Sequence, residues 1–108
     1  MIFVTKQGDT RTALKAQLLN SEGNPVDLTD SLVYFRMSEF TNSTTRINRQ
    51  ALVQENGEVW FVFEKDEVSK PGFFKAEFHV EYPDGRKEVF PNSGYIKVTI
   101  EPSVGGVE

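Results

Sequence analysis

Residues Gly72–Glu101 read GFFKAEFHVEYPDGRKEVFPNSGYIKVTIE and contain three consecutive strand patterns. In the first pattern, apolar residues occupy every second position and polar residues lie between them. A period of two places these two sets on opposite faces of a strand. The apolar set is Phe74, Ala76, Phe78, Val80 and Tyr82, and the polar set is Lys75, Glu77, His79 and Glu81. We expect the apolar set to face the core.

A tight turn, YPDGR, follows at positions 82–86. Pro83 presets φ for the first corner, Asp84 suits the second, and Gly85 can adopt a positive φ. These residues predict a type I turn closed by a glycine bulge, which is a common hairpin connection. Two more strands are then expected, over Arg86–Phe90 and Tyr95–Glu101. In the last strand, Ile96, Val98 and Ile100 should face inward.

Similar short patterns fill the rest of the chain. We expect further strands over residues 2–4, 12–19, 32–37, 46–54 and 59–63, with one helical turn within 64–71 and an exposed, mobile loop over 38–45. The Asn56-Gly57 pair predicts a hairpin turn, because both positions favour positive φ. Val59–Phe63 is apolar on both faces, which predicts a central strand that is covered on both sides or lies under a loop.

The regular spacing of these segments predicts an all-β fold. About seven to eight short strands separated by turn residues, without a long amphipathic helix, are typical of an antiparallel β-sandwich or a small barrel. The chain has 108 residues, which suits a single domain. We expect one β-sandwich domain over residues 1–101 and a flexible C-terminal tail over residues 102–108.

The composition excludes several classes of protein. There is no cysteine, so disulfides and cysteine-based metal sites are excluded. No secretory signal and no apolar run of membrane-spanning length is visible. The formal net charge is −4, which argues against nucleic-acid binding because phosphate contacts need a concentrated basic face. We therefore expect no nucleic-acid partner and no membrane contact.

A search for catalytic or metal-binding residues finds no convincing set. His79 is the only histidine, and it lies between two glutamates on the polar face of its strand. A metal site would need more nitrogen or sulfur ligands, and no nucleophile-elbow motif occurs. Glu64, Asp66 and Glu67 lack the ligand spacing of a calcium loop, so a solvated charge run is the preferred interpretation. We expect no catalytic residue, no cofactor and no metal.

Aromatic residues offer two interpretations. Trp60, Phe61, Phe63, Phe73, Phe90 and Tyr95 could line a sugar-binding platform, or they could pack in the core. Core packing accounts for most of them, because aromatic side chains dominate the cores of small β-domains. Phe73 is the exception, since it falls on the polar face of its strand. An exposed Phe73, together with Lys75, Glu77 and His79, forms the candidate interface.

Three groups of turn motifs, taken together, resemble a known family. They are QGDT at 7–10, GNPVDLT at 23–29, and the series PG at 71–72, DGR at 84–86, FPN at 90–92 and YI at 95–96. Their order and spacing are similar to the N-terminal immunoglobulin-like domain of phage baseplate upper proteins from viruses and prophages of Gram-positive bacteria. The resemblance covers Thr5–Glu101 and implies an immunoglobulin-like β-sandwich without enzyme activity.

The resemblance implies a structural module of a phage tail or baseplate. Such a module would be made in the bacterial cytoplasm and built into the virion, where it would dock onto other tail or baseplate proteins. A homo-oligomer in the virion is compatible with this role. The alternative hypothesis is a small carbohydrate-binding β-sandwich that contacts the host cell wall.

Overall fold

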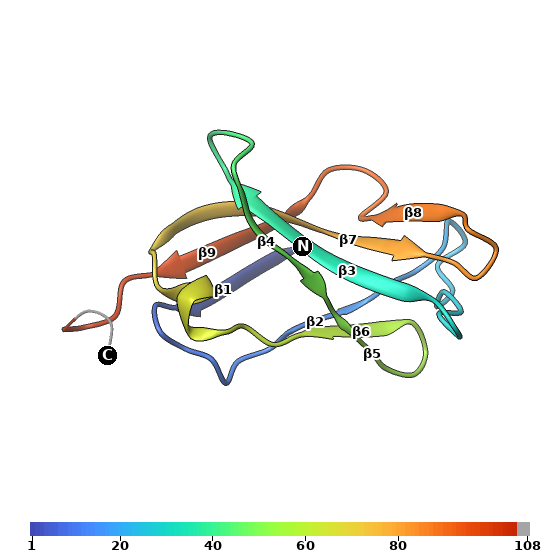
Figure 1. Cartoon of the computed structure of the whole chain (residues 1–108), viewed down its shortest axis with the longest axis horizontal. Helices are drawn as coiled ribbons and strands as arrows, with labels where there is room; N and C mark the ends of the chain where they lie inside the picture. Colours follow the sequence, from blue (N-terminus) through green and yellow to red (C-terminus); the bar gives the residue numbers. More distant parts are fainter. Residues whose placement is uncertain (106–108) are drawn as a thin grey trace.

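The protein, described over residues 1–105 by a computed structural model, consists of two β-sheets (Figure 1). The strands are β1 (Ile2–Lys6), β2 (Leu14–Gln17), β3 (Leu32–Glu39), β4 (Thr45–Gln50), β5 (Leu52–Val53), β6 (Glu58–Phe61), β7 (Gly72–Glu81), β8 (Lys87–Phe90) and β9 (Ile96–Glu101), and one 3-10 turn, η1 (Lys65–Val68), precedes β7. The prediction of a mostly-β, sandwich-like fold is confirmed, with nine strands instead of seven to eight. No helix among residues 1–105 is long and apolar enough to cross a membrane.

The larger sheet has six strands and is built around β7. Its order is β1-β9-β7-β3-β4, and β8 pairs with the far end of β7. All neighbours are antiparallel except β1 and β9, which run parallel. The prediction of a purely antiparallel fold is therefore wrong at this edge. A parallel pair needs no hairpin, and these two strands come from opposite ends of the chain.

The smaller sheet has the order β2-β6-β5. The strand predicted over residues 46–54 is in fact two strands, because the chain leaves the larger sheet after β4 and enters the smaller one at β5. The change occurs at Ala51, which is buried and donates its N–H to the carbonyl of Val33 at 2.8 Å.

The strand β6 is central in the smaller sheet, as predicted. Its outer face is not fully covered, because Trp60 is half-buried and Val62, just after the strand, is exposed.

The core lies between the two sheets. Phe35 of β3 stacks on Phe61 of β6 with ring centroids 4.2 Å apart, and it also contacts Phe78 of β7 at 5.3 Å. Phe3 of β1 stacks on Phe63, which follows β6, at 5.8 Å. The inward-facing residues predicted for β7 and β9 are buried, except for the half-buried Tyr82. Aromatic stacking between the layers therefore fixes how the sheets face each other.

Both predicted hairpin turns are confirmed. Gly85 has a φ of +87° and donates its N–H to the carbonyl of Tyr82 at 2.9 Å. Asn56 and Gly57 have φ values of +57° and +71°, as a type I′ turn requires. The predicted helical turn is also present as η1.

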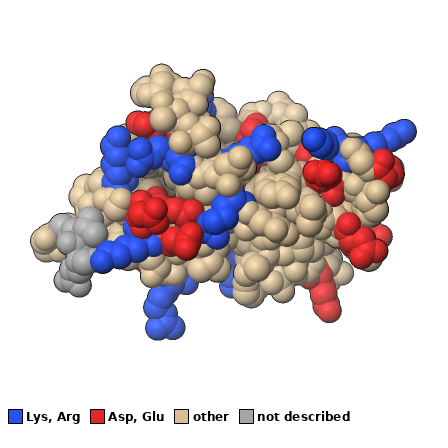
Figure 2. Space-filling view, viewed as in Figure 1, with Lys and Arg blue, Asp and Glu red and all other residues tan. Residues whose placement is uncertain are grey.

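The acidic group beside η1 is bound by an arginine rather than simply solvated. Arg49 of β4 donates to both carboxylate oxygens of Glu67, at 2.7 and 3.0 Å, and lies 3.3 Å from Glu64. This hydrogen bonding raises the pKa of Arg49. Figure 2 shows the acidic group surrounded by basic side chains on this face of the molecule. The preferred interpretation of a solvated charge run is therefore wrong for Glu67, which links η1 to the edge of the larger sheet.

The first residues of the predicted tail contact Gln7, which directly follows β1. Ser103 donates its N–H to the side-chain carbonyl of Gln7 at 3.3 Å and its hydroxyl to the Gln7 main-chain carbonyl. The predicted tail extends to residue 108, and positions 106–108 lie outside the described residues.

Candidate functional site: the outer face of the larger sheet

The outer face of the larger sheet carries the candidate site. Its side chains form rows across the strands, because the pairing register fixes which residues are neighbours. One row runs Val4, Thr99, Phe73 over β1, β9 and β7. The next row runs Ile2, Lys97, Lys75 over the same strands. Two rows of one sheet thus bring residues from both ends of the chain together.

Large apolar side chains are exposed on these rows and on the adjacent loops. Exposed fractions are 71% for Ile2, 51% for Val4, 61% for Phe73, 37% for Phe40 and 40% for Tyr95. Phe40 lies just after β3 and donates its N–H to the Phe73 carbonyl at 3.1 Å, and its ring contacts Tyr95 edge-on at 5.7 Å. We call the set Ile2, Val4, Phe40, Phe73, Lys75, Tyr95 and Lys97 the Phe73 patch. Several large exposed apolar side chains on one face are typical of interaction sites.

Two lysines lie over the aromatic rings of the Phe73 patch. The Lys97 ammonium is 5.7 Å from the centroid of the Phe73 ring, and the Lys75 ammonium is 6.0 Å from that of Phe40. Within residues 1–105, neither ammonium has a carboxylate oxygen within 4 Å. Lysines just outside the patch are paired: Lys6 with Glu101 at 3.6 Å and Lys70 with Glu39 at 3.5 Å.

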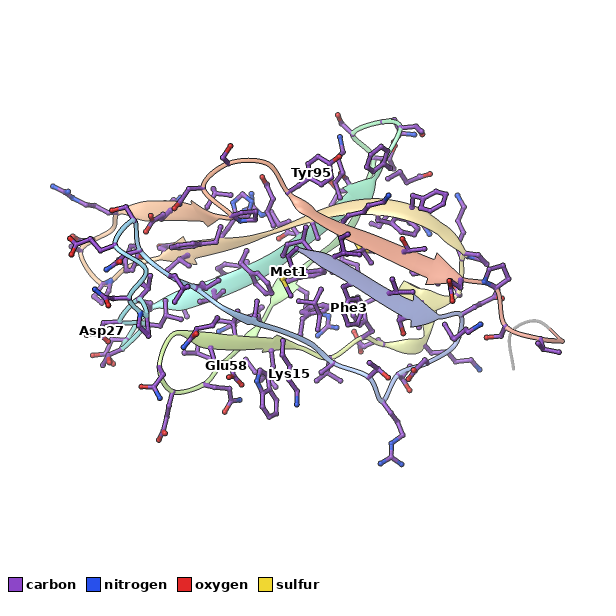
Figure 3. All side chains as sticks on the ribbon, turned by 180° about the vertical axis from the view of Figure 1, so that it is seen from behind. Met1, Phe3, Lys15, Asp27, Glu58 and Tyr95 are labelled. Atoms are coloured by element: carbon purple, nitrogen blue, oxygen red, sulfur yellow. The ribbon has the colours of Figure 1, made fainter. Side chains whose placement is uncertain are left out.

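A groove of about 390 Å³ adjoins the Phe73 patch. Its lining includes Arg36, Lys75, Glu77, His79 and Tyr95, and the loops after β3 and after β8 border it. Both loops project from the same side of the larger sheet (Figure 1), and Tyr95 lies just before β9 (Figure 3). His79 Nε2 is 3.2 Å from Glu77 Oε1. The groove thus combines one aromatic ring with charged hydrogen-bonding groups.

The structure brings the four predicted interface residues onto one face but divides them. Phe73 is exposed in the Phe73 patch, Glu77 and His79 are half-buried in the groove, and Lys75 belongs to both. Sequence reasoning missed Phe40, because its loop was interpreted as polar. The exposed loop is also shorter than predicted, since residues 38 and 39 belong to β3 and residue 45 to β4.

Ile2 and Val4 were missed as well, although a signal for them existed. A period of two places Ile2 and Val4 on one face of their strand and Phe3 on the other, so a strand with one buried face exposes one of these two sets. The sequence around Lys97 does not predict that this residue belongs to the site, because its place there depends on the pairing of β9 with β7.

The aromatic residues do not form one sugar-binding platform. Phe61, Phe63 and Phe90 are buried in the core. Phe73 and Tyr95 lie on the outer face of the larger sheet, whereas Trp60 lies on the smaller one. Core packing is therefore the correct interpretation for three of the six.

The outer face of the smaller sheet exposes Leu52 and Val62 around the half-buried Trp60. The indole N–H of Trp60 donates to the Glu58 carboxylate, and the Lys15 ammonium lies 4.1 Å from the ring centroid (Figure 3). Trp60 thus has partners for its polar edge and its ring within its own sheet. This makes it a weaker candidate for an interface than Phe73.

In the part of the chain that the structure describes, no three His, Cys, Asp or Glu side chains gather in a way that could hold a metal ion.

No protein-family profile matches the chain. No curated protein matches it with significant similarity. The surface itself and the resemblance in the turn motifs are therefore the features that bear on function.

Proposed function

We propose that this protein is an immunoglobulin-like structural module of a phage tail or baseplate that acts by protein–protein docking through the Phe73 patch. The observation that carries the proposal is the exposed apolar surface of five large side chains on one face of the larger sheet. Exposing such residues is unfavourable unless a partner covers them in the assembled state. The turn motifs that resemble baseplate upper proteins supply the biological context.

The residues of the site are arranged as in a small protein–protein interface. Phe73 is central, with apolar residues on both sides and charged residues at the border. Interfaces commonly have an aromatic anchor within a polar rim. A specific interface needs about 800 Å² from each partner. The patch with its groove is one part of such an area, and repeated copies on a symmetric tail would add avidity.

Co-sedimentation with tails tests the proposal. The chain, its Phe73→Ser variant and its Leu52→Ser variant are each expressed in a strain that produces the cognate tails, and tails are isolated on a density gradient. Leu52 is the matched control, because it is also an exposed apolar residue but lies on the smaller sheet. We expect the wild-type chain and Leu52→Ser to sediment with tails and Phe73→Ser to be depleted. A wild-type chain that never sediments with tails would contradict the proposal.

The groove supports a second candidate function, the binding of a cell-wall carbohydrate. Tyr95 beside Arg36, Glu77 and His79 provides a stacking ring and polar partners of the kind that sugar sites use. A glycan array with the isolated domain tests this alternative. Retention of a wall saccharide that is lost in Tyr95→Ala and kept in Phe73→Ser would favour it over docking.

A further inference from the structure

We propose that the docking partner presents an acidic segment whose carboxylate binds between Lys75 and Lys97 while an adjacent apolar side chain packs on Phe73. This inference rests on the proposed function and specifies the chemistry of the partner.

The first argument is an unfavourable pair in the sheet. Lys75 and Lys97 are direct cross-strand partners in the antiparallel pair β7–β9. Like charges placed directly opposite each other destabilise a sheet. The described residues supply no carboxylate within 4 Å of either ammonium. Each ammonium lies over an aromatic ring, Lys75 over Phe40 and Lys97 over Phe73, but no negative charge neutralises the pair. A local rule broken without a neutralising charge is typical of a functional surface.

The second argument is the contrast with the overall charge. The chain has sixteen acidic and twelve basic residues, yet the Phe73 patch contains two lysines and no acidic residue. An acidic segment would gain two charge-assisted contacts there, and its apolar neighbour would be covered by Phe73 and Val4. Charge and apolar surface thus match one type of partner.

A second copy of this chain fits poorly. In a symmetric pair the same patch would face itself, because a two-fold interface is self-complementary. Lys75 and Lys97 of both copies would then enter an interface to which neither patch contributes a carboxylate. Electrostatic repulsion disfavours this arrangement.

Peptide titration followed by NMR tests the inference. Isotope-labelled protein is titrated into the millimolar range with an end-blocked acidic peptide, GEFEG, its basic counterpart, GKFKG, and inorganic phosphate. We expect only the acidic peptide to shift the amides of residues 73–75 and 95–99. In Lys97→Glu the affinity should fall about tenfold or more, equivalent to about 1.4 kcal/mol. The fold should be retained, because this change places opposite charges on the cross-strand pair.

Lys15→Glu is the matched control, since Lys15 also lies over an aromatic ring but on the other sheet. It should leave the peptide shifts unchanged. The inference is overturned by the absence of shifts, by equal shifts with the basic peptide, or by shifts that persist in Lys97→Glu. Equal shifts with phosphate alone would also overturn it, because they would indicate a simple anion site.

The tail assay separates this inference from the proposed function. If Phe73→Ser is depleted from tails and Lys97→Glu is not, the result supports docking through the Phe73 patch. The same result contradicts the proposal that the partner presents an acidic segment. If both variants sediment normally with tails, the Phe73 patch is not the docking surface. If the wild-type chain is absent from tails, the proposed function fails even when the acidic peptide binds.

Discussion

The two faces of β7 differ sharply although they belong to one strand. On the inner face, Phe74, Ala76, Phe78 and Val80 are each at most 3% exposed. On the outer face, Phe73 is exposed and Lys75, Glu77 and His79 are half-buried. The inner face holds the two sheets together, and the outer face offers groups that have few internal partners. Strand alternation therefore lets stability and the proposed docking be altered separately by mutation.

The largest expected effect is that of Phe78→Ala. Phe78 is fully buried and packs on Phe35, so its truncation should lower the free energy of unfolding by about 3–5 kcal/mol. Chemical denaturation measures this change. His79→Ala is the control on the opposite face and should be nearly silent. Equal losses in the two variants would contradict the distinction between the faces.

The next effect is that of Gly85→Val in the turn after β7. This turn sets the register of β8 on β7, and a one-residue slip would exchange the two faces. The φ of +87° at Gly85 is unfavourable for a β-branched residue, so we expect a loss of about 1–2 kcal/mol. Gly105→Val should change little, because Gly105 lies beyond the last strand. Identical denaturation midpoints for wild type and Gly85→Val would contradict the expected cost of a β-branched residue at this positive φ.

A smaller, pH-dependent effect is expected from Tyr82, which continues the inner face. Burial, followed by the 2.7 Å hydrogen bond to Glu88, raises the pKa of Tyr82 above its ordinary value near 10. The folded state then keeps its proton where the unfolded state loses it. The resulting stability is fully present below pH ~10 and falls as the pH rises further. Urea midpoints between about pH 9 and 11 should therefore fall more steeply in wild type than in Tyr82→Phe.

The smallest change in stability is expected for Phe73→Ser. The Phe73 side chain is exposed, so its loss should change the free energy of unfolding by only about 0.5 kcal/mol or less. Thermal and urea denaturation measure this value. A loss comparable to that of Phe78→Ala would mean that Phe73 supports the fold, and the tail assay could then no longer be interpreted as a test of docking.

Local sequence rules predicted most of the elements. Strand faces and turn types depend on neighbouring residues. The sequence therefore predicts the alternation in β7, the Gly85 turn and the Asn56-Gly57 turn. The exposure of Phe73 followed from the same alternation. These features need no knowledge of distant parts of the chain.

Long-range pairing could not be predicted in the same way. The parallel contact of β1 with β9 joins residues from opposite ends of the chain, and no turn motif specifies it. The passage between sheets at Ala51 interrupts a pattern that looks like one strand. The Lys75–Lys97 pair and the contact of Phe40 with Tyr95 depend on this tertiary arrangement, so half of the candidate site was hidden from sequence reasoning.

The parallel pairing of β1 and β9 also has a mechanical consequence. The chain begins at the start of β1 and leaves the sheet at the end of β9, and both strands point the same way (Figure 1). A pulling force applied between Met1 and Glu101 would act along the strands and stretch the hydrogen bonds of all five paired positions at once, in shear. Force applied instead between Phe78 and Phe90, the paired residues at the open end of the β7–β8 hairpin, would open its bonds one after another. Single-molecule pulling should therefore find higher rupture forces for the first geometry, and equal forces would contradict it.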